Sequence, residues 1–144
     1  MNAAELAAAC AASMWDDDRA SQALGMAIES ITPGEAVMTM TVTEAMANGH
    51  GTCHGGYIFT LADSAFAFAC NTYNQNAVAQ QAAITYIAPA FVGEKLTAEA
   101  REVSRRGRGG IYDVVVKNPF GETIAVFRGH SRTVKGTHLP EQNQ

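Results

Sequence analysis

The stretch that decides the fold is Asn48-Gly-His-Gly-Thr-Cys-His54-Gly55-Gly56, which continues into Tyr57-Ile-Phe-Thr-Leu-Ala-Asp63-Ser-Ala-Phe-Ala-Phe-Ala-Cys70. Four glycines among the first nine residues predict a loop of tight turns. The fourteen residues that follow contain no Gly or Pro and are rich in Ala, Leu and Phe, so they predict a helix. Its second half, Ala65 to Cys70, is apolar on every side, which is typical of a helix surrounded by protein.

One acidic residue, Asp63, lies within this apolar helix. A carboxylate is costly to bury unless a partner holds it. A lone acid in such surroundings therefore has either a partner or a chemical role, and perturbed acids gather at functional sites. Asp63 is the first candidate for a catalytic residue in this chain.

Length and composition limit the class of protein. The 144 residues are most simply one domain, residues 1–144, with a core of its own. The apolar fraction of 47% and the charged fraction of 17% are ordinary for a compact globular protein. Because the net charge is −4 at pH 7, the composition gives no general case for nucleic-acid binding.

The cysteines and the N-terminal residues bear on the compartment. Cys10, Cys53 and Cys70 form no CxxC pair, and an odd set of thiols favours a reducing environment. Glu5 precedes the first basic residue, Arg19, which is not the pattern of a signal peptide. No apolar run reaches the length of a membrane span. We therefore expect a cytoplasmic protein with no membrane partner.

Outside the central stretch, the pattern predicts one further helix and six strands. Ala-rich residues 2–13 favour a helix within an N-terminal helical extension, residues 1–20, and Asp16 to Asp18 suit an exposed turn. The polar tail, residues 136–144, is expected to be loose. Alternating or β-branched segments between turn signals predict strands at residues 24–31, 35–43, 78–88, 94–103, 111–117 and 122–134.

The order of these elements predicts an α+β fold. Consecutive strands joined by short turns form an antiparallel sheet. A helix that is apolar nearly all round can be buried only if a curved sheet wraps around it and something covers its other side. We therefore expect an antiparallel six-stranded sheet wrapped around one long central helix.

The start of the central helix offers unpaired backbone N–H groups. If the helix begins near Gly55, the amides of Gly55, Gly56 and Tyr57 have no partner within it. Glycines let a ligand approach closely, and the helix dipole favours developing negative charge, as in an oxyanion hole. The alternative is a turn whose glycines serve only the backbone angles, and the local pattern alone favours it.

Distance along the helix leads to a prediction about a second chain. Asp63 lies eight residues after Gly55, or about 12 Å at roughly 1.5 Å per residue. A carboxylate that acts on a carbonyl carbon must lie within about 3 to 3.5 Å of it. One chain cannot place both groups on one carbonyl, whereas two chains with antiparallel helices can. If this is a site, the protein is a dimer with two shared active sites.

The loop contains other reactive side chains, which we considered as a metal site or a nucleophile. His50, Cys53 and His54 lie close together, but the loop offers no fourth ligand at the usual spacing for a structural zinc. Cys53 and His54 are adjacent, and adjacent residues rarely let their side chains meet as nucleophile and base. We therefore expect no metal and no cysteine nucleophile.

Three motifs together carry a resemblance to a known family. They are Asn48-Gly-x-Gly-x-x-His-Gly-Gly56 followed by Leu-Ala-Asp63, then Ile84-Thr-Tyr-Ile-Ala-Pro89, and Arg128-Gly-His-Ser131 near the end. This pattern resembles the hotdog-fold acyl-CoA thioesterases, and within them the PaaI-type branch that acts in phenylacetic acid degradation. The resemblance covers residues 20 to 136 and implies a hotdog fold, an acyl-CoA substrate and no cofactor beyond the CoA of that substrate.

The resemblance also implies a role for each residue of the motif. Asn48 would help to place the thioester or the attacking water, and Gly55 would give the N–H that binds the thioester oxygen. His54 matches a position that helps to orient this site. Asp63, from the partner chain, would be the catalytic carboxylate, either as a base on water or as a nucleophile through an anhydride.

The CoA end of the site is expected at a basic turn. Ser104-Arg-Arg-Gly107-Arg108-Gly109-Gly110 gathers three arginines and three glycines between two strands, which could meet phosphates. By resemblance, Gly107, Arg108 and Gly109 would bind CoA together with His130, Ser131 and Arg132 of the last strand. A solvated basic hairpin is the alternative.

Three function classes follow from these residues. The first is an acyl-CoA thioesterase, active as a dimer or a dimer of dimers, with a phenylacetyl or hydroxyphenylacetyl group as the substrate that the resemblance implies. The second is a hotdog dehydratase, in which His54 and Asp63 would move a proton and expel water from a hydroxyacyl thioester. The third is a non-catalytic acyl-CoA-binding protein, which would not need Asp63.

Overall fold

A computed structural model of the chain describes residues 1–140. Within this range, four helical segments and six strands follow one another. They are α1 (Ala3–Asp17), α2 (Arg19–Ala23), β1 (Ala27–Thr32), β2 (Glu35–Thr41), the 3-10 turn η1 (Glu44–Met46), α3 (Gly55–Cys70), β3 (Ala77–Tyr86), β4 (Lys95–Arg106), β5 (Gly109–Lys117) and β6 (Thr123–Thr133).

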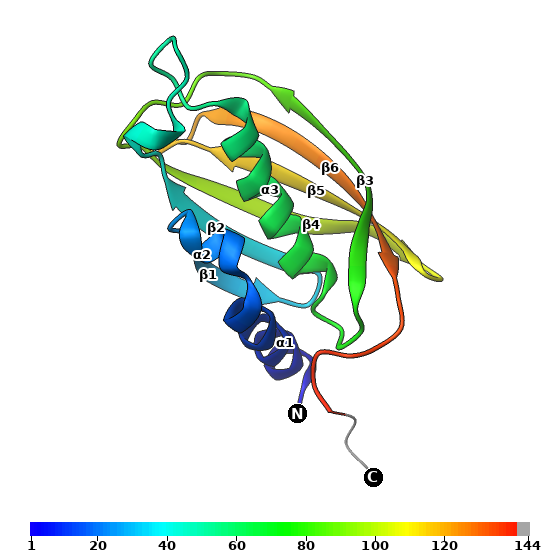
Figure 1. The fold of residues 1–144 in the computed structure, drawn as a ribbon. Helices are drawn as coiled ribbons and strands as arrows, with labels where there is room; N and C mark the ends of the chain where they lie inside the picture. Colours follow the sequence, from blue (N-terminus) through cyan, green and yellow to red (C-terminus); the bar gives the residue numbers. More distant parts are fainter. Residues whose placement is uncertain (141–144) are drawn as a thin grey trace.

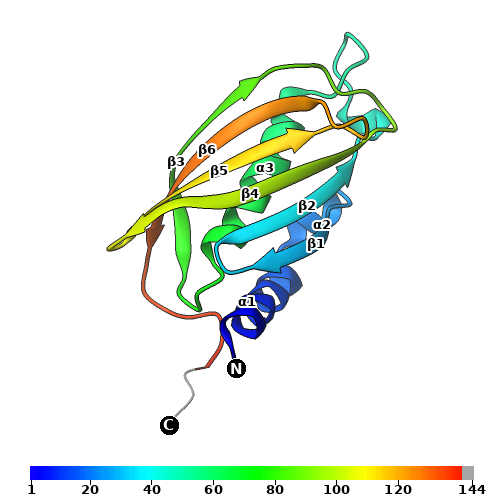
Figure 2. The ribbon, with the colours of Figure 1, turned by 180° about the vertical axis from the view of Figure 1, so that it is seen from behind.

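The six strands form one sheet in the order β1-β2-β4-β5-β6-β3, and every neighbouring pair is antiparallel. The sheet curves around α3, which lies against one of its faces (Figure 1). Seen from behind, the opposite face carries no helix from the described part of the chain (Figure 2). The predicted α+β arrangement, an antiparallel six-stranded sheet wrapped around one long helix, is therefore confirmed.

The core lies between α3 and the concave face of the sheet. Leu61, Phe66 and Phe68 of α3 are fully buried, as the apolar pattern of this helix predicted. Phe66 lies directly on β6, where Gly129 leaves room for its ring: a Cβ at Gly129 would stand 2.8 Å from three ring carbons. This close approach fixes the distance between α3 and β6.

The N-terminal segment differs from the prediction in its boundaries. Helix α1 continues to Asp17, so Asp16 and Asp17 do not form the exposed turn that we expected. Asp18 ends α1 and caps α2, because its side chain accepts a hydrogen bond from the Ser21 N–H at 3.0 Å. The first strand starts later than residue 24 because Gly25 takes a left-handed conformation after α2, with φ of +71°.

The C-terminal tail also differs from the loose segment that we predicted, as far as the structure describes it. The side chain of Asn74 accepts hydrogen bonds from the backbone N–H groups of His138 and Leu139, at 3.1 and 2.9 Å. The His138 ring is hydrogen-bonded through Nε2 to Asn71 Oδ1 at 2.8 Å. These contacts hold the tail against the end of α3 up to Leu139. The last four residues of the tail lie outside the described residues.

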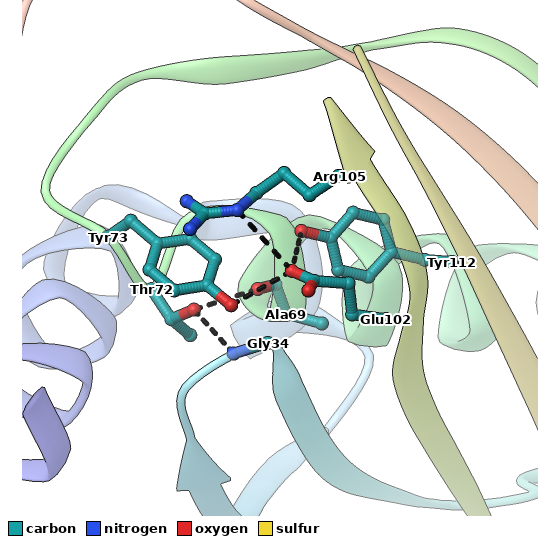
Figure 3. Close-up of polar contacts among 7 residues, drawn as sticks. All are labelled: Gly34, Ala69, Thr72, Tyr73, Glu102, Arg105 and Tyr112. Carbon is teal, nitrogen blue, oxygen red and sulfur yellow. Dashed lines mark hydrogen bonds and ion pairs between the residues drawn. The ribbon is translucent and has the colours of Figure 1, made fainter. Parts of the chain in front are cut away.

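A polar cluster joins the far end of α3 to the β4–β5 hairpin (Figure 3). Glu102 Oε1 accepts hydrogen bonds from the hydroxyls of Tyr73 and Tyr112, at 2.8 and 3.1 Å. Arg105 Nε lies 3.7 Å from the same carboxylate oxygen, and its guanidinium carbon lies 3.4 Å from the centroid of the Tyr73 ring. This cluster attaches the half of the hairpin nearest its turn to the segment that follows α3.

Candidate active site

The hydrogen bonds at the start of α3 distinguish one backbone amide from its neighbours. The His54 ring caps the helix, since its Nδ1 accepts a hydrogen bond from the Gly56 N–H at 2.9 Å. The Tyr57 N–H donates to the His54 carbonyl at 3.0 Å, and the His54 N–H donates to the Met46 carbonyl at 2.7 Å. Of the three amides that the sequence offered, only the Gly55 N–H has no hydrogen-bond partner among residues 1–140.

Asn48 organises the loop that leads into this helix. Its Oδ1 accepts hydrogen bonds from the backbone N–H groups of His50 and Thr52, at 2.9 and 3.2 Å. Its Nδ2 donates to the Thr52 hydroxyl at 2.9 Å. The side chain therefore has a structural role as an Asx-type turn former. Its role toward a substrate stays a prediction.

Asp63 lies half-buried on α3, and burial raises the pKa of its carboxyl above the ordinary value of 3.8. No hydrogen-bond partner of this carboxylate is found within the part of the chain that the structure describes. The hydroxyl of the next residue, Ser64, is hydrogen-bonded to that of Ser21 at 2.8 Å, so Ser64 faces α2. Phe59, one turn before Asp63, packs on Phe127 of β6 with ring centroids 5.5 Å apart. Asp63 thus lies on the same flank of α3 as Phe59, the flank that faces β6.

Gly55 and Asp63 belong to one uninterrupted helix, Gly55–Cys70. Eight residues of regular helix separate them by about 12 Å. In a single protomer the two groups are therefore too far apart to act on the same carbonyl carbon, as the sequence predicted.

The basic turn and the end of β6 lie side by side. Gly107 and Arg108 form a two-residue turn between paired Arg106 and Gly109, and Gly107 supplies the positive φ, +59°, at its first position. The carbonyl of Arg108 accepts a hydrogen bond from the Thr133 N–H at 2.8 Å. The structure therefore brings the predicted CoA-binding turn into contact with the predicted segment of the last strand.

The three candidate residues of β6 do not share one surface. Ser131 is buried on the inner face of the sheet, whereas its neighbours His130 and Arg132 point to the outer face, because successive side chains of a strand alternate. In addition, Arg105 of the basic turn is already paired with Glu102. The side chains of Arg106 and Arg108 are exposed.

The cysteines and the other possible metal ligands form no reactive group in the described part of the chain. All three cysteines are free and buried, and burial raises the pKa of Cys53 and raises that of Cys70 to about 12. Among residues 1–140, no three His, Cys, Asp or Glu side chains are grouped so as to hold a metal ion. Within the same range, no helix combines the length and the apolar character needed to cross a membrane.

A groove of about 770 Å³ lies on the outer face of the sheet, opposite α3. Two exposed ion pairs line it: Lys117 with Glu99 at 3.1 Å, and Arg128 with Asp113 at 2.6 Å. It contains neither Gly55 nor Asp63, so we do not assign the reaction to it.

One contact at the site had no signal in the sequence. The hydroxyl of Tyr86, the last residue of β3, donates a hydrogen bond to the carbonyl of Gly55 at 2.8 Å. Tyr86 belongs to one of the motifs quoted above, but its spacing of 31 residues from Gly55 gives no indication of contact. Only the pairing of β3 with β6 brings it to the start of α3.

Comparison with known proteins identifies the family. A family model described as the thioesterase superfamily matches residues 50–125. Acyl-coenzyme A thioesterase PaaI of Escherichia coli is 45% identical over 124 residues, which cover 86% of this chain and 89% of that protein. This chain belongs to the thioesterase superfamily. The PaaI-type resemblance and the hotdog fold that it implied are confirmed.

Solved structures agree with this assignment of the thioesterase. The structure of E. coli PaaI, from the phenylacetic acid degradation operon, has a TM-score of 0.93 and 43% identity, and covers 94% of this chain and 99% of that one. A Streptococcus mutans protein solved with bound acetyl-CoA has a TM-score of 0.75 and 26% identity, and covers 78% of this chain and 90% of that one.

Proposed function

We propose that this thioesterase hydrolyses acyl-CoA thioesters of the phenylacetyl or hydroxyphenylacetyl type to the free acid and CoA. The observation that carries the proposal is a pair of groups without partners in the described protomer. One is the Gly55 N–H at the start of α3, and the other is the half-buried carboxylate of Asp63. The first suits a thioester oxygen and the second suits water or the thioester carbon.

The Gly55 N–H binds the oxygen on which negative charge develops. The N-terminus of α3 adds its dipole, and the His54 cap withdraws the Gly56 amide from competition. A donor held in place before the reaction stabilises the oxyanion without reorganisation, and removal of one such donor costs about 100-fold to 1,000-fold in kcat in other enzymes.

Asp63 of the partner subunit acts on the carbonyl carbon. As a base, it takes a proton from water while the water oxygen attacks the carbon; the C–S bond then breaks and the CoA thiolate takes a proton. As a nucleophile, it forms an acyl anhydride and releases CoA, and water then cleaves the anhydride. Burial raises the pKa of Asp63, which makes its carboxylate both a stronger base and a stronger nucleophile, so the shift favours either route.

The open edge of β3 supports a dimer. β3 pairs with β6 on one side only, and no strand formed by residues 1–140 lies beside its other edge. Large apolar side chains are exposed along this strand and the loop that follows, which is the signature of an interaction surface. These residues are Val78, Tyr86, Ile87, Phe91 and Val92.

Two such edges paired antiparallel would set the two α3 helices antiparallel as well. The Ala77 end of β3 in one protomer would then meet the Tyr86 end in the other. In one protomer, Gly107 and Arg108 lie beside Cys70, at the end of α3 remote from Gly55. The pairing would bring this turn near Gly55 of the partner subunit, where the exposed guanidinium of Arg108 could meet CoA phosphates.

An aromatic acyl group fits the surroundings of Asp63. Phe59 lies one helical turn from Asp63 and packs edge-on against Phe127. Such rings form a wall for a phenyl group by offset or edge-to-face contact. The reaction needs no cofactor beyond the CoA of the substrate, and this intracellular substrate agrees with a cytoplasmic enzyme. The name of the E. coli relative points to the same class of substrate.

The test is a panel of aromatic and aliphatic acyl-CoAs, with release of free thiol as the readout. We expect the highest kcat/KM with phenylacetyl-type substrates and loss of turnover with retained CoA affinity in Asp63→Asn and Asp63→Ala. Faster cleavage of aliphatic substrates would overturn the aryl assignment. Turnover by both Asp63 variants equal to that of the unmodified protein would overturn the catalytic role of Asp63, whereas CoA binding without any turnover by the unmodified protein would favour an acyl-CoA-binding protein.

The dehydratase alternative predicts a different product. It is tested with a 3-hydroxyacyl-CoA, by the absorbance of the enoyl thioester that forms when water is lost. We expect no enoyl product. Its appearance at a rate above that of thiol release would replace the thioesterase proposal. Oligomeric state is measured in parallel by light scattering, and an active monomer would contradict the shared site.

A further inference from the structure

We propose that Tyr86 is a positioning residue for the reaction, because it holds Gly55 in the orientation in which its N–H receives the thioester oxygen. This inference rests on the proposed function of Gly55. The Tyr86 hydroxyl donates a hydrogen bond to the Gly55 carbonyl at 2.8 Å. The ring also covers the Gly55 Cα, since a Cβ built there would stand 2.8 Å from Tyr86 Cζ.

The need for such a restraint follows from the sequence at this point. Gly55 and Gly56 are the first two residues of α3, and glycine is the residue least restricted in its backbone angles. The first turn of a helix is also where the hydrogen-bonded ladder frays. An oxyanion donor, however, is effective only when its direction is set before the charge develops.

Two contacts set the direction of the Gly55 N–H. The peptide that contains it also contains the His54 carbonyl, which accepts a hydrogen bond from the Tyr57 N–H at 3.0 Å. On the other side of the Cα, the Gly55 carbonyl is held by Tyr86. With both flanking carbonyls engaged, the rotation of Gly55 between them is restricted. The hydroxyl proton of Tyr86 is used in this bond, so Tyr86 acts through Gly55.

Tyr86 also links the site to the edge of the sheet. It is the last residue of β3, the strand whose free edge the proposed dimer would cover, and the residue is 49% exposed in the protomer. A partner subunit on this edge would immobilise the ring and, through it, Gly55. Formation of the dimer would thus tighten the oxyanion site in addition to supplying Asp63.

The test is Tyr86→Phe, which keeps the ring and removes only the hydroxyl. We expect kcat to fall about tenfold, the effect of one hydrogen bond worth about 1.4 kcal/mol, with KM nearly unchanged. Tyr73→Phe is the matched control, because it removes a phenol hydrogen bond of the same 2.8 Å length, from Tyr73 to Glu102. We expect it to change stability while kcat stays that of the unmodified protein.

A binding measurement separates positioning from general loss of structure. Two unreactive CoA analogues are compared: a ketone that keeps the carbonyl but replaces sulfur by CH₂, and a thioether that lacks the carbonyl. Tyr86→Phe should weaken binding of the ketone several-fold and leave binding of the thioether unchanged. Equal weakening of both analogues, or unchanged kcat, overturns the role of Tyr86.

The failure of this inference can be told from failure of the proposed function. If the unmodified protein cleaves no acyl-CoA and binds ketone and thioether alike, the proposed role of Gly55 is wrong. The other case is an unmodified protein that is active and binds the ketone more tightly than the thioether. If Tyr86→Phe then has the same kcat and the same preference for the ketone, with unchanged melting temperature and dimer mass, only the role of Tyr86 is wrong.

Discussion

The ring of His54 caps helix α3 by accepting a hydrogen bond from the Gly56 N–H at 2.9 Å. This contact has a consequence for the neighbouring residue, because it occupies one of the free amides at the helix start and leaves that of Gly55 available. His54 therefore has a definite structural contribution to the site, and this contribution can be tested separately from any direct contact with substrate.

The first prediction concerns the chemistry of this cap. His54→Ala removes the acceptor and should lower the free energy of unfolding by about 1 kcal/mol. The same variant should also lower kcat/KM. His54→Asn places a good capping oxygen at the same position and should retain most of both quantities. Urea denaturation and thiol release measure them. Equal loss in the two variants would show that the imidazole has a role beyond capping.

The second prediction concerns the dependence of activity on pH. If Asp63 must be ionised to act as base, kcat/KM falls as the pH drops through its pKa. Because burial raises this pKa, the acid limb should lie above the ordinary value of 3.8. A pH–rate profile with a phenylacetyl-CoA substrate measures the limb. A limb at or below that ordinary value would contradict the burial argument.

The third prediction concerns stability at the same residue. The pKa of Asp63 is higher in the folded than in the unfolded state. At pH values between these two pKa values the folded state binds more protons than the unfolded state, so the free energy of unfolding falls as the pH rises through this range. Asp63→Asn carries no such charge. The variant should therefore melt at a higher temperature than the unmodified protein at pH 8, and the gain should vanish at pH values below both pKa values. Calorimetry at several pH values provides the comparison.

The fourth prediction tests the close approach of α3 to β6. Gly129→Ala would place a Cβ 2.8 Å from the ring of Phe66, which is fully buried and cannot move aside. We expect the free energy of unfolding to fall by about 1 to 3 kcal/mol. Gly49→Ala is the control, because a Cβ there meets nothing within 4 Å. Comparable urea midpoints for the two variants would contradict this packing.

The fifth prediction concerns the thiols. Burial raises the pKa of Cys10, Cys53 and Cys70, the last to about 12, and the thiolate is the reactive form. The native protein at pH 8 should therefore resist iodoacetamide, and all three thiols should react after unfolding. Mass spectrometry counts the labels. Rapid labelling of Cys70 in the native protein would show that the end of α3 opens.

The elements of the fold could be predicted because their signals are local. Apolar residues without Gly or Pro mark α3, and alternation marks the strands, since a side-chain period depends only on neighbours in the chain. The expected turn at Asp16 to Asp18 was wrong because aspartate suits both a turn and a helix cap. The tail contacts of His138 were missed because Asn74, their partner, lies 64 residues away.

The same distinction, between local signals and contacts of distant residues, holds for the candidate site. By itself, the sequence determined the loop, the helix start at Gly55 and the eight-residue interval to Asp63, because helical rise converts an interval into a distance. Only the tertiary structure decided that Tyr86 meets Gly55 and that the turn at Arg108 meets Thr133 at the end of β6. These relations depend on strand pairing and on the direction of side chains in space, and no local period specifies them.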